Sequence, residues 1–85
     1  MKKFVINANL IYTVDVKGIS IVNQMELTHI FIQYPDAAVW SVLVENYGKS
    51  KSIKMLQSIL GKNETDTERY IWKCIENWKQ LNIIL

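Results

Sequence analysis

The sequence has little of the chemistry that marks most enzymes and secreted proteins. Its 85 residues include one cysteine, one histidine, one proline and three glycines. Because Cys74 is alone, a disulfide framework and a cysteine metal cluster are excluded. Ten basic and eight acidic side chains give a net charge of +2. The two signs are interspersed, so the basic footprint typical of nucleic-acid binding is missing.

No targeting or membrane segment is expected either. The apolar run after Lys2 and Lys3 is interrupted by Asn7 and Asn9, so we predict neither a signal peptide nor a membrane span, and a cytoplasmic location. What the chain does have is apolar content, at 49% hydrophobic and 11% aromatic residues. That content predicts a packed core, and the length suits a single domain over residues 1–85.

Catalytic residues are equally scarce. His29 is the only histidine and falls in a predicted strand, where a partly exposed structural role is the simpler interpretation. Cys74 falls on the apolar face of a predicted helix and is interpreted as a core residue. The carboxylates form no obvious pair, and the glycines mark element boundaries rather than a phosphate loop. We predict that the chain is not an enzyme and has no cofactor or metal site.

Period-two alternation in the N-terminal half predicts strands. We expect them at residues 10–15, 19–23 and 27–33, with turns at 16–18 and 24–26. Gly18 can take the positive φ that a tight turn often needs. The simplest arrangement is a three-stranded antiparallel meander whose third strand lies at an edge.

Helical signals begin at Pro35, which suits the first position of a helix, with Asp36 at the positive end of the dipole. We expect helices near residues 36–47, 50–60 and 66–81, the third opened by a capping box of Thr65 and Glu68. The side chains expected to face the core are Val39, Trp40, Leu43 and Tyr47, then Ile53, Leu56 and Leu60, then Ile71, Cys74, Ile75, Trp78 and Leu81. Residues 82–85 would pack on the sheet as an extended tail. The predicted fold class is α+β and winged-helix-like, in the order βββααα.

Trp72 does not fit the core face of the third helix. At roughly 100° per residue it lies on the shoulder of that face, beside Glu68, Glu76 and Lys79. It either covers the edge of the core or lines a groove for a partner, since tryptophan is enriched at binding hot spots.

The order of the predicted strands and helices is similar to that of a known family. Residues 12–15 with Gly18 give a hairpin with glycine at its turn, and residues 30–40 give a third strand that runs into a helix. Residues 78–84 end the last helix, with Asn82 in place of a usual glycine. From about residue 10 to residue 85 the chain resembles a PqqD-like domain, the RiPP recognition element of PqqD or lasso-peptide clusters. A usual Leu-Asn step is Ile32-Gln33 here.

The resemblance implies a function. Such a domain binds the leader segment of a ribosomally made precursor peptide, which adds as a β-strand to the edge of the third strand against the third helix, and presents it to a modifying enzyme or peptidase. The implied binding residues are Thr28, His29, Ile30, Phe31, Ile32, Glu68, Trp72, Ile75, Glu76 and Lys79. Strand 27–33 has no proline or lysine to guard its edge, which fits peptide addition.

Two alternatives remain open. One is a winged-helix DNA-binding regulator, weakened because all strands precede the helices and the third helix mixes both charge signs. The other is a subunit that only scaffolds a larger enzyme. On the leading interpretation neither nucleic acid nor membrane is a partner.

Overall fold

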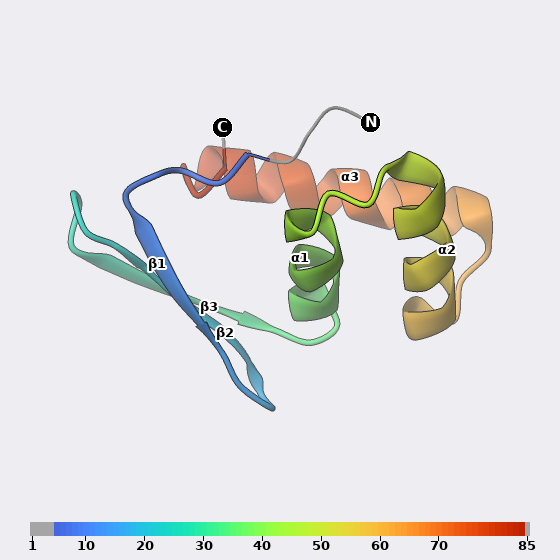
Figure 1. Cartoon of the computed structure of the whole chain (residues 1–85), viewed down its shortest axis with the longest axis horizontal. Coiled ribbons are helices and arrows are strands. Elements are labelled where there is room, and N and C mark those ends of the chain that lie inside the picture. The colour runs from blue at the N-terminus through green and yellow to red at the C-terminus, as the bar shows by residue number, and fades with distance from the viewer. Residues whose placement is uncertain (1–4, 85) are drawn as a thin grey trace.

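The computed structural model describes residues 5–84. Its elements are β1 (Leu10–Val14), β2 (Gly18–Asn23), β3 (Thr28–Gln33), α1 (Asp36–Val44), α2 (Lys49–Leu60) and α3 (Glu64–Gln80). In Figure 1 the sheet lies to one side of the helices, and α3 runs along the long axis of the molecule with α1 and α2 against it. The predicted α+β order βββααα is confirmed.

The sheet is an antiparallel meander in the order β1-β2-β3, so the third strand does lie at an edge. Ile21 in the central strand faces Tyr12 on one side and Ile30 on the other. Gly18, which opens β2, is required by space. A Cβ at this position would lie 2.1 Å from the carbonyl oxygen of Ile32, so no other residue fits without moving β3.

One face of the sheet packs on the helices through aromatic side chains. The ring of Trp40 in α1 meets the ring of Trp78 in α3 edge to face, at 5.3 Å between centroids. Tyr12 in β1 meets Trp40 in the same manner at 5.7 Å. Ile19 and Ile21 of β2 belong to the same hydrophobic core and are fully buried. This core fixes α3 over the sheet.

α1 starts at Asp36 as predicted, but its end differs from the prediction. Pro35 caps the helix rather than opening it, and follows a cis peptide bond. The helix ends at Val44, not at 47, because Asn46 turns to a left-handed φ of 54° before Gly48 is reached. Tyr47 therefore lies outside the helix and is exposed. α2 buries Ile53 and Leu56 as predicted, half-buries Leu60, and ends at a left-handed Gly61.

The predicted capping box of α3 is wrong. Asn63 caps the helix two residues earlier, its side-chain oxygen accepting from the backbone N–H of Asp66 at 2.8 Å. Thr65 then falls within the first turn and is exposed. Four of the predicted core residues are buried, namely Ile71, Cys74, Ile75 and Trp78. Leu81, the fifth, is 43% exposed and follows the end of the helix.

The backbone of the C-terminal tail pairs with the N-terminal segment, and its Ile83 and Ile84 side chains are buried in the core that also holds Ile19, Ile21 and Ile32 of the sheet. Asn82, which stands where the resembled family usually has glycine, takes a left-handed φ of 58°. Ile84 then forms a bridge with Ile6, and the Ile83 carbonyl accepts from the N–H of Asn7 at 3.2 Å. Leu85, the last residue of the predicted tail, lies outside the described residues. Over residues 5–84, none of the helices combines the length and apolar content needed to cross a bilayer.

Candidate functional site

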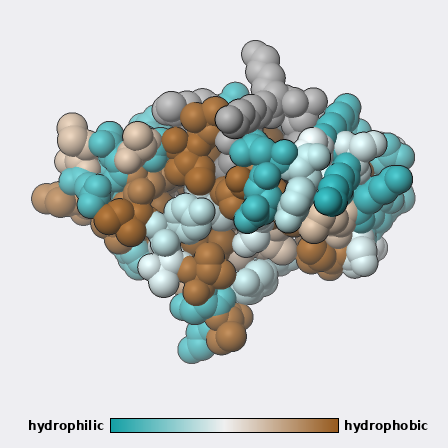
Figure 2. Space-filling view, in the orientation of Figure 1, coloured by the Kyte–Doolittle hydropathy of each residue, from teal (hydrophilic) through white to brown (hydrophobic). Residues whose placement is uncertain are grey.

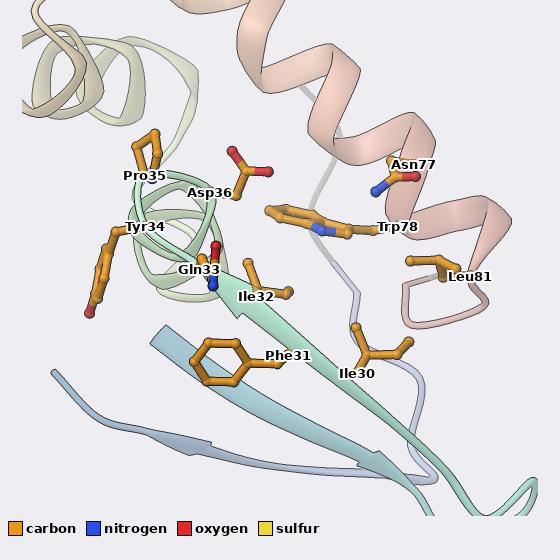
Figure 3. A pocket seen from close by; sticks show the side chains of 10 residues that line it. All are labelled: Ile30, Phe31, Ile32, Gln33, Tyr34, Pro35, Asp36, Asn77, Trp78 and Leu81. Carbon is orange, nitrogen blue, oxygen red and sulfur yellow. The ribbon is translucent and has the colours of Figure 1, made fainter. Parts of the chain in front are cut away.

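A groove of about 610 Å³ opens between β3 and α3. Its strand side is Ile30, Phe31, Ile32, Gln33, Tyr34, Pro35 and Asp36, and its helix side is Asn77, Trp78 and Leu81. In Figure 3 the side chains of Ile30 and Ile32 point toward α3, and that of Phe31 points to the opposite face of the sheet. The groove therefore has an apolar floor, and a polar end at Asp36 and Asn77.

The register shows which backbone groups of β3 are left unpaired by β2. The N–H of Asp15 donates to the Gly18 carbonyl and that of Gln24 to the Asn9 carbonyl, each at 2.9 Å. Because hydrogen-bonded pairs alternate along an antiparallel ladder, residues 18, 20 and 22 of β2 bond to β1, and residues 19, 21 and 23 bond to β3.

The partners of those last three residues are Thr28, Ile30 and Ile32. The N–H and C=O groups of His29, Phe31 and Gln33 consequently point away from β2. No strand of the described chain pairs with this edge. This edge therefore offers the backbone N–H and C=O groups of three residues to a partner, along one side of the groove.

The polar end of the groove continues along α3. A second cavity of about 260 Å³ is lined by Asp36, Tyr70, Lys73, Cys74 and Asn77, and shares Asp36 and Asn77 with the larger groove. The Tyr70 hydroxyl donates a hydrogen bond to the Asp36 carboxylate. This bond joins the start of α1 to the middle of α3, so it fixes the helix wall relative to the strand wall.

The pKa values of two titratable groups in this cavity are shifted. Burial, assisted by the negative charge of Asp36, raises the pKa of the Cys74 thiol to about 12. The pKa of Tyr70 is also raised above its ordinary value of 10.0, first by burial and then by its hydrogen bond to Asp36. Both groups stay protonated at neutral pH. Cys74 is therefore a poor nucleophile, and Tyr70 stays a hydrogen-bond donor.

The strand residues predicted from sequence are divided by the structure. Ile30, Phe31 and Ile32 line the groove. Thr28 and His29 are exposed at the start of the same strand, outside the groove lining. His29 is thus the exposed strand histidine expected from the sequence. Its backbone, rather than its imidazole, belongs to the open edge.

The predicted helix residues lie elsewhere on α3. None of Glu68, Trp72, Ile75, Glu76 and Lys79 lines the groove. Glu68 pairs with Lys49 of α2 at 3.0 Å, and Ile75 is buried in the core. Glu76 and Lys79 are exposed. Trp72 is 46% exposed, and at 100° per residue it lies roughly 140–180° around the helix from Asn77 and Leu81.

Sequence reasoning missed Asn77 and assigned Trp78 and Leu81 to the core alone. Asn77 and Leu81 are four residues apart and so share one flank of α3. That spacing is a usable signal. Choosing this flank over the one that carries Trp72 requires the rotation of α3 relative to β3, which the sequence pattern does not contain. Across residues 5–84, histidine, cysteine and carboxylate side chains form no cluster suited to a metal ion.

Comparison with known proteins bears on the fold. No family model and no curated protein sequence matches the chain. Two solved structures are similar to it. A lasso peptide synthetase B1 complexed with the leader peptide superposes with a TM-score of 0.87 at 15% identity, covering 99% of both chains. TbiB1 in complex with the TbiA(beta) leader peptide gives 0.83 at 10% identity, covering 94% of this chain and 93% of that one. The chain therefore has the PqqD-like fold that its sequence predicted.

Proposed function

We propose that residues 1–85 form one leader-peptide-binding domain, a RiPP recognition element, and that the chain acts by binding rather than by catalysis. The observation that carries this proposal is the open edge of β3, where unpaired backbone groups border a groove closed on its other side by α3. Both solved structures that share the fold hold a leader peptide. The likeness supports a precursor peptide as the ligand here.

The bound leader adds to the sheet as a fourth strand beside β3. Its backbone pairs with the outward N–H and C=O groups of His29, Phe31 and Gln33. Alternate side chains of the leader enter the groove, where Ile30 and Ile32 form the floor. Backbone pairing supplies sequence-independent affinity, and the groove selects the side chains. The remainder of the precursor stays available to a modifying enzyme or peptidase.

The helix side of the site has two sets of candidate contacts. Asn77, Trp78 and Leu81 line the groove directly. The helix contacts predicted from sequence, in addition to residues 28–32 on the strand, form the second set: Glu68, Trp72, Ile75, Glu76 and Lys79. Of this second set, Ile75 is buried in the core. A peptide reaches the others only by continuing beyond the groove to the opposite flank of α3.

The test is fluorescence anisotropy with fluorescein-labelled N-terminal segments of the short reading frames encoded beside this gene. The matched variants are Phe31→Pro and Phe31→Ala. Proline removes the outward N–H, whereas alanine removes the side chain and keeps the N–H. We expect Phe31→Ala to bind within a few-fold of the wild type and Phe31→Pro to lose binding, both remaining folded by circular dichroism. Ile30→Pro serves as the contrast, since it removes an N–H that belongs to the ladder with β2 and should destabilise the sheet itself.

Each outcome separates one part of the proposal. A folded Phe31→Pro variant that binds like the wild type contradicts strand addition at β3. If the wild type binds none of the leader segments, leader recognition itself fails. Salt distinguishes the DNA-binding alternative, because apolar pockets and backbone pairing are weakly screened. We expect less than about a tenfold loss of affinity between 50 and 200 mM salt, against about 10³–10⁵ for a protein that contacts many phosphates.

A further inference from the structure

The sheet has a second open edge, on the outer side of β1. No strand within residues 5–84 pairs there, and β2 separates this edge from β3 and its groove. By the same ladder alternation, the N–H and C=O groups of Tyr12 and Val14 point away from β2. The Leu10 carbonyl points outward too, while its N–H donates to the Asn7 carbonyl at 3.1 Å. Five outward backbone groups therefore lack a strand partner.

The side chains of β1 do nothing to protect this edge. Natural edge strands are usually guarded by lysine, proline or a bulge. β1 carries no charged residue and no proline, and its sequence is Leu-Ile-Tyr-Thr-Val. Ile11 is 53% exposed, Tyr12 39% and Val14 54%, so apolar surface is exposed on both faces of the strand. Figure 2 shows apolar side chains gathered over the sheet, whereas the α2 end of the molecule is mostly hydrophilic.

We propose that β1 pairs with β1 of a second copy of this chain, antiparallel, about a twofold axis at Tyr12. In that register Tyr12 of each copy exchanges N–H and C=O with Tyr12 of the other. The N–H of Val14 donates to the Leu10 carbonyl of the second copy. About four backbone hydrogen bonds form, and they use the groups that β2 leaves free. The contact is isologous, so it closes at two copies.

A second copy of the chain is the proposed partner because β1 can pair with itself. Antiparallel pairing about Tyr12 places Ile11 opposite Thr13 of the second copy, and Leu10 opposite Val14. The nearest charged side chain, Asp15, faces Asn9, so no like charges meet. A sheet of six strands results, with both β3 edges at its ends. Pairing through β1 therefore leaves the proposed leader site open and does not depend on it.

Charge swapping at the facing positions tests the register. One variant carries Ile11→Glu with Thr13→Glu, and the other carries Ile11→Lys with Thr13→Lys. Both positions are exposed on the sheet face away from the helices, so the fold should persist, with circular dichroism as the check. The neutral control is Ile11→Ser with Thr13→Ser. Sedimentation velocity from about 10 µM to about 1 mM covers the range of a small interface.

We expect the average mass of the wild type to rise toward that of two copies with concentration. Each charged variant alone should associate at least about tenfold more weakly, since like charges face each other across the axis. The two charged variants mixed in equal amounts should associate at least as well as the neutral control. A wild type that stays monomeric, charged variants that self-associate like the wild type, or a mixture that does not associate would each overturn the proposal. Leader binding by the charged variants should equal that of the wild type.

Discussion

The hydroxyl of Tyr70 in α3 donates a hydrogen bond to the carboxylate of Asp36 in the first turn of α1, across 34 positions of sequence. Asp36 follows β3 closely and lines both cavities. The bond therefore ties the end of the strand wall to the helix wall. Its buried surroundings also raise the pKa of Tyr70, which keeps the donor proton in place.

Tyr70→Phe removes this bond and leaves the Asp36 carboxylate without its donor. We expect the free energy of unfolding to fall by about 1.5–3 kcal/mol, as for other hydrogen bonds to a charged group. The matched control is Tyr47→Phe, because Tyr47 is exposed and its contact with Lys51, at 4.4 Å, involves the ring alone. That control should change stability by less than about 0.5 kcal/mol. Urea denaturation measures both, and equal effects would mean that the Tyr70 bond contributes nothing specific.

Alkaline pH should weaken the fold through Cys74. The pKa of its thiol rises from the ordinary value of 9.0 to about 12 in the folded chain. Below pH 9 both states keep the proton, so stability is unaffected. Above pH 9 the unfolded chain releases the proton and the folded chain does not, so stability falls as pH rises toward 12.

Cys74→Ala isolates this contribution. At pH 7 the variant should be the less stable protein, because it leaves a small cavity in the core. The difference in melting temperature should narrow as pH rises from 9 to 11, since alanine has no proton to lose. A difference that stays constant over that range would contradict the assignment. A tyrosine contribution, expected from Tyr70 above pH 10.0, remains in both proteins, because burial and Asp36 are its larger causes.

The β2–β3 hairpin contains a residue in an unfavourable conformation. Leu27 has a φ of 56° and is 86% exposed. A left-handed conformation costs a branched apolar residue about 1–2 kcal/mol, and asparagine much less. Because the side chain buries almost nothing, Leu27→Asn should stabilise the fold by up to about 1 kcal/mol. The contrast is Leu27→Val, whose β-branch should destabilise it. Melting temperatures compare the two, and equal shifts would show that φ is not the cause.

The order and approximate extent of the elements could be predicted because local signals agree with the fold. Gly18, Pro35 and Gly61 all lie at element boundaries in the structure. The start of α3 could not be predicted, because Asn63 and Thr65 are both good capping residues two positions apart. The backbone path from α2 selects Asn63. The end of α1 was missed for a similar reason. Asn46 adopts the left-handed conformation that glycine more often takes, two residues before Gly48.

The site, too, could be predicted from the sequence only in part. The open edge of β3 could be predicted, because a three-stranded meander must leave its last strand at an edge. The residues of α3 that line the groove could not be predicted. α3 has an apolar face with a polar flank on each side, and the sequence pattern is nearly symmetric about that face. Its rotation is set by contacts among distant residues, above all the edge-to-face contact of Trp40 with Trp78. That rotation turns Asn77 and Leu81 toward β3.

Three substitutions in and just after α3 test how far a bound leader reaches. The sequence-based prediction is that Trp72→Ala weakens leader binding by about 2 kcal/mol and leaves the fold intact, as for a hot-spot tryptophan. Trp72 is 46% exposed, so its removal should cost little stability. Because it lies on the flank opposite the groove, such a loss requires the peptide to continue past the groove onto that flank. Leu81→Ala tests the groove itself and should weaken binding by about 1 kcal/mol.

Trp78→Ala is the structural control. Trp78 is 2% exposed and packs edge to face against Trp40, so its truncation should cost about 3–5 kcal/mol of stability and unfold much of the protein. Anisotropy with the labelled leader segments measures affinity, and urea denaturation measures stability. A loss of affinity in Leu81→Ala with none in Trp72→Ala would confine the leader to the groove and contradict the prediction for Trp72. If Trp72→Ala melted the protein instead, its indole would be covering the core edge, the other interpretation that the sequence left open.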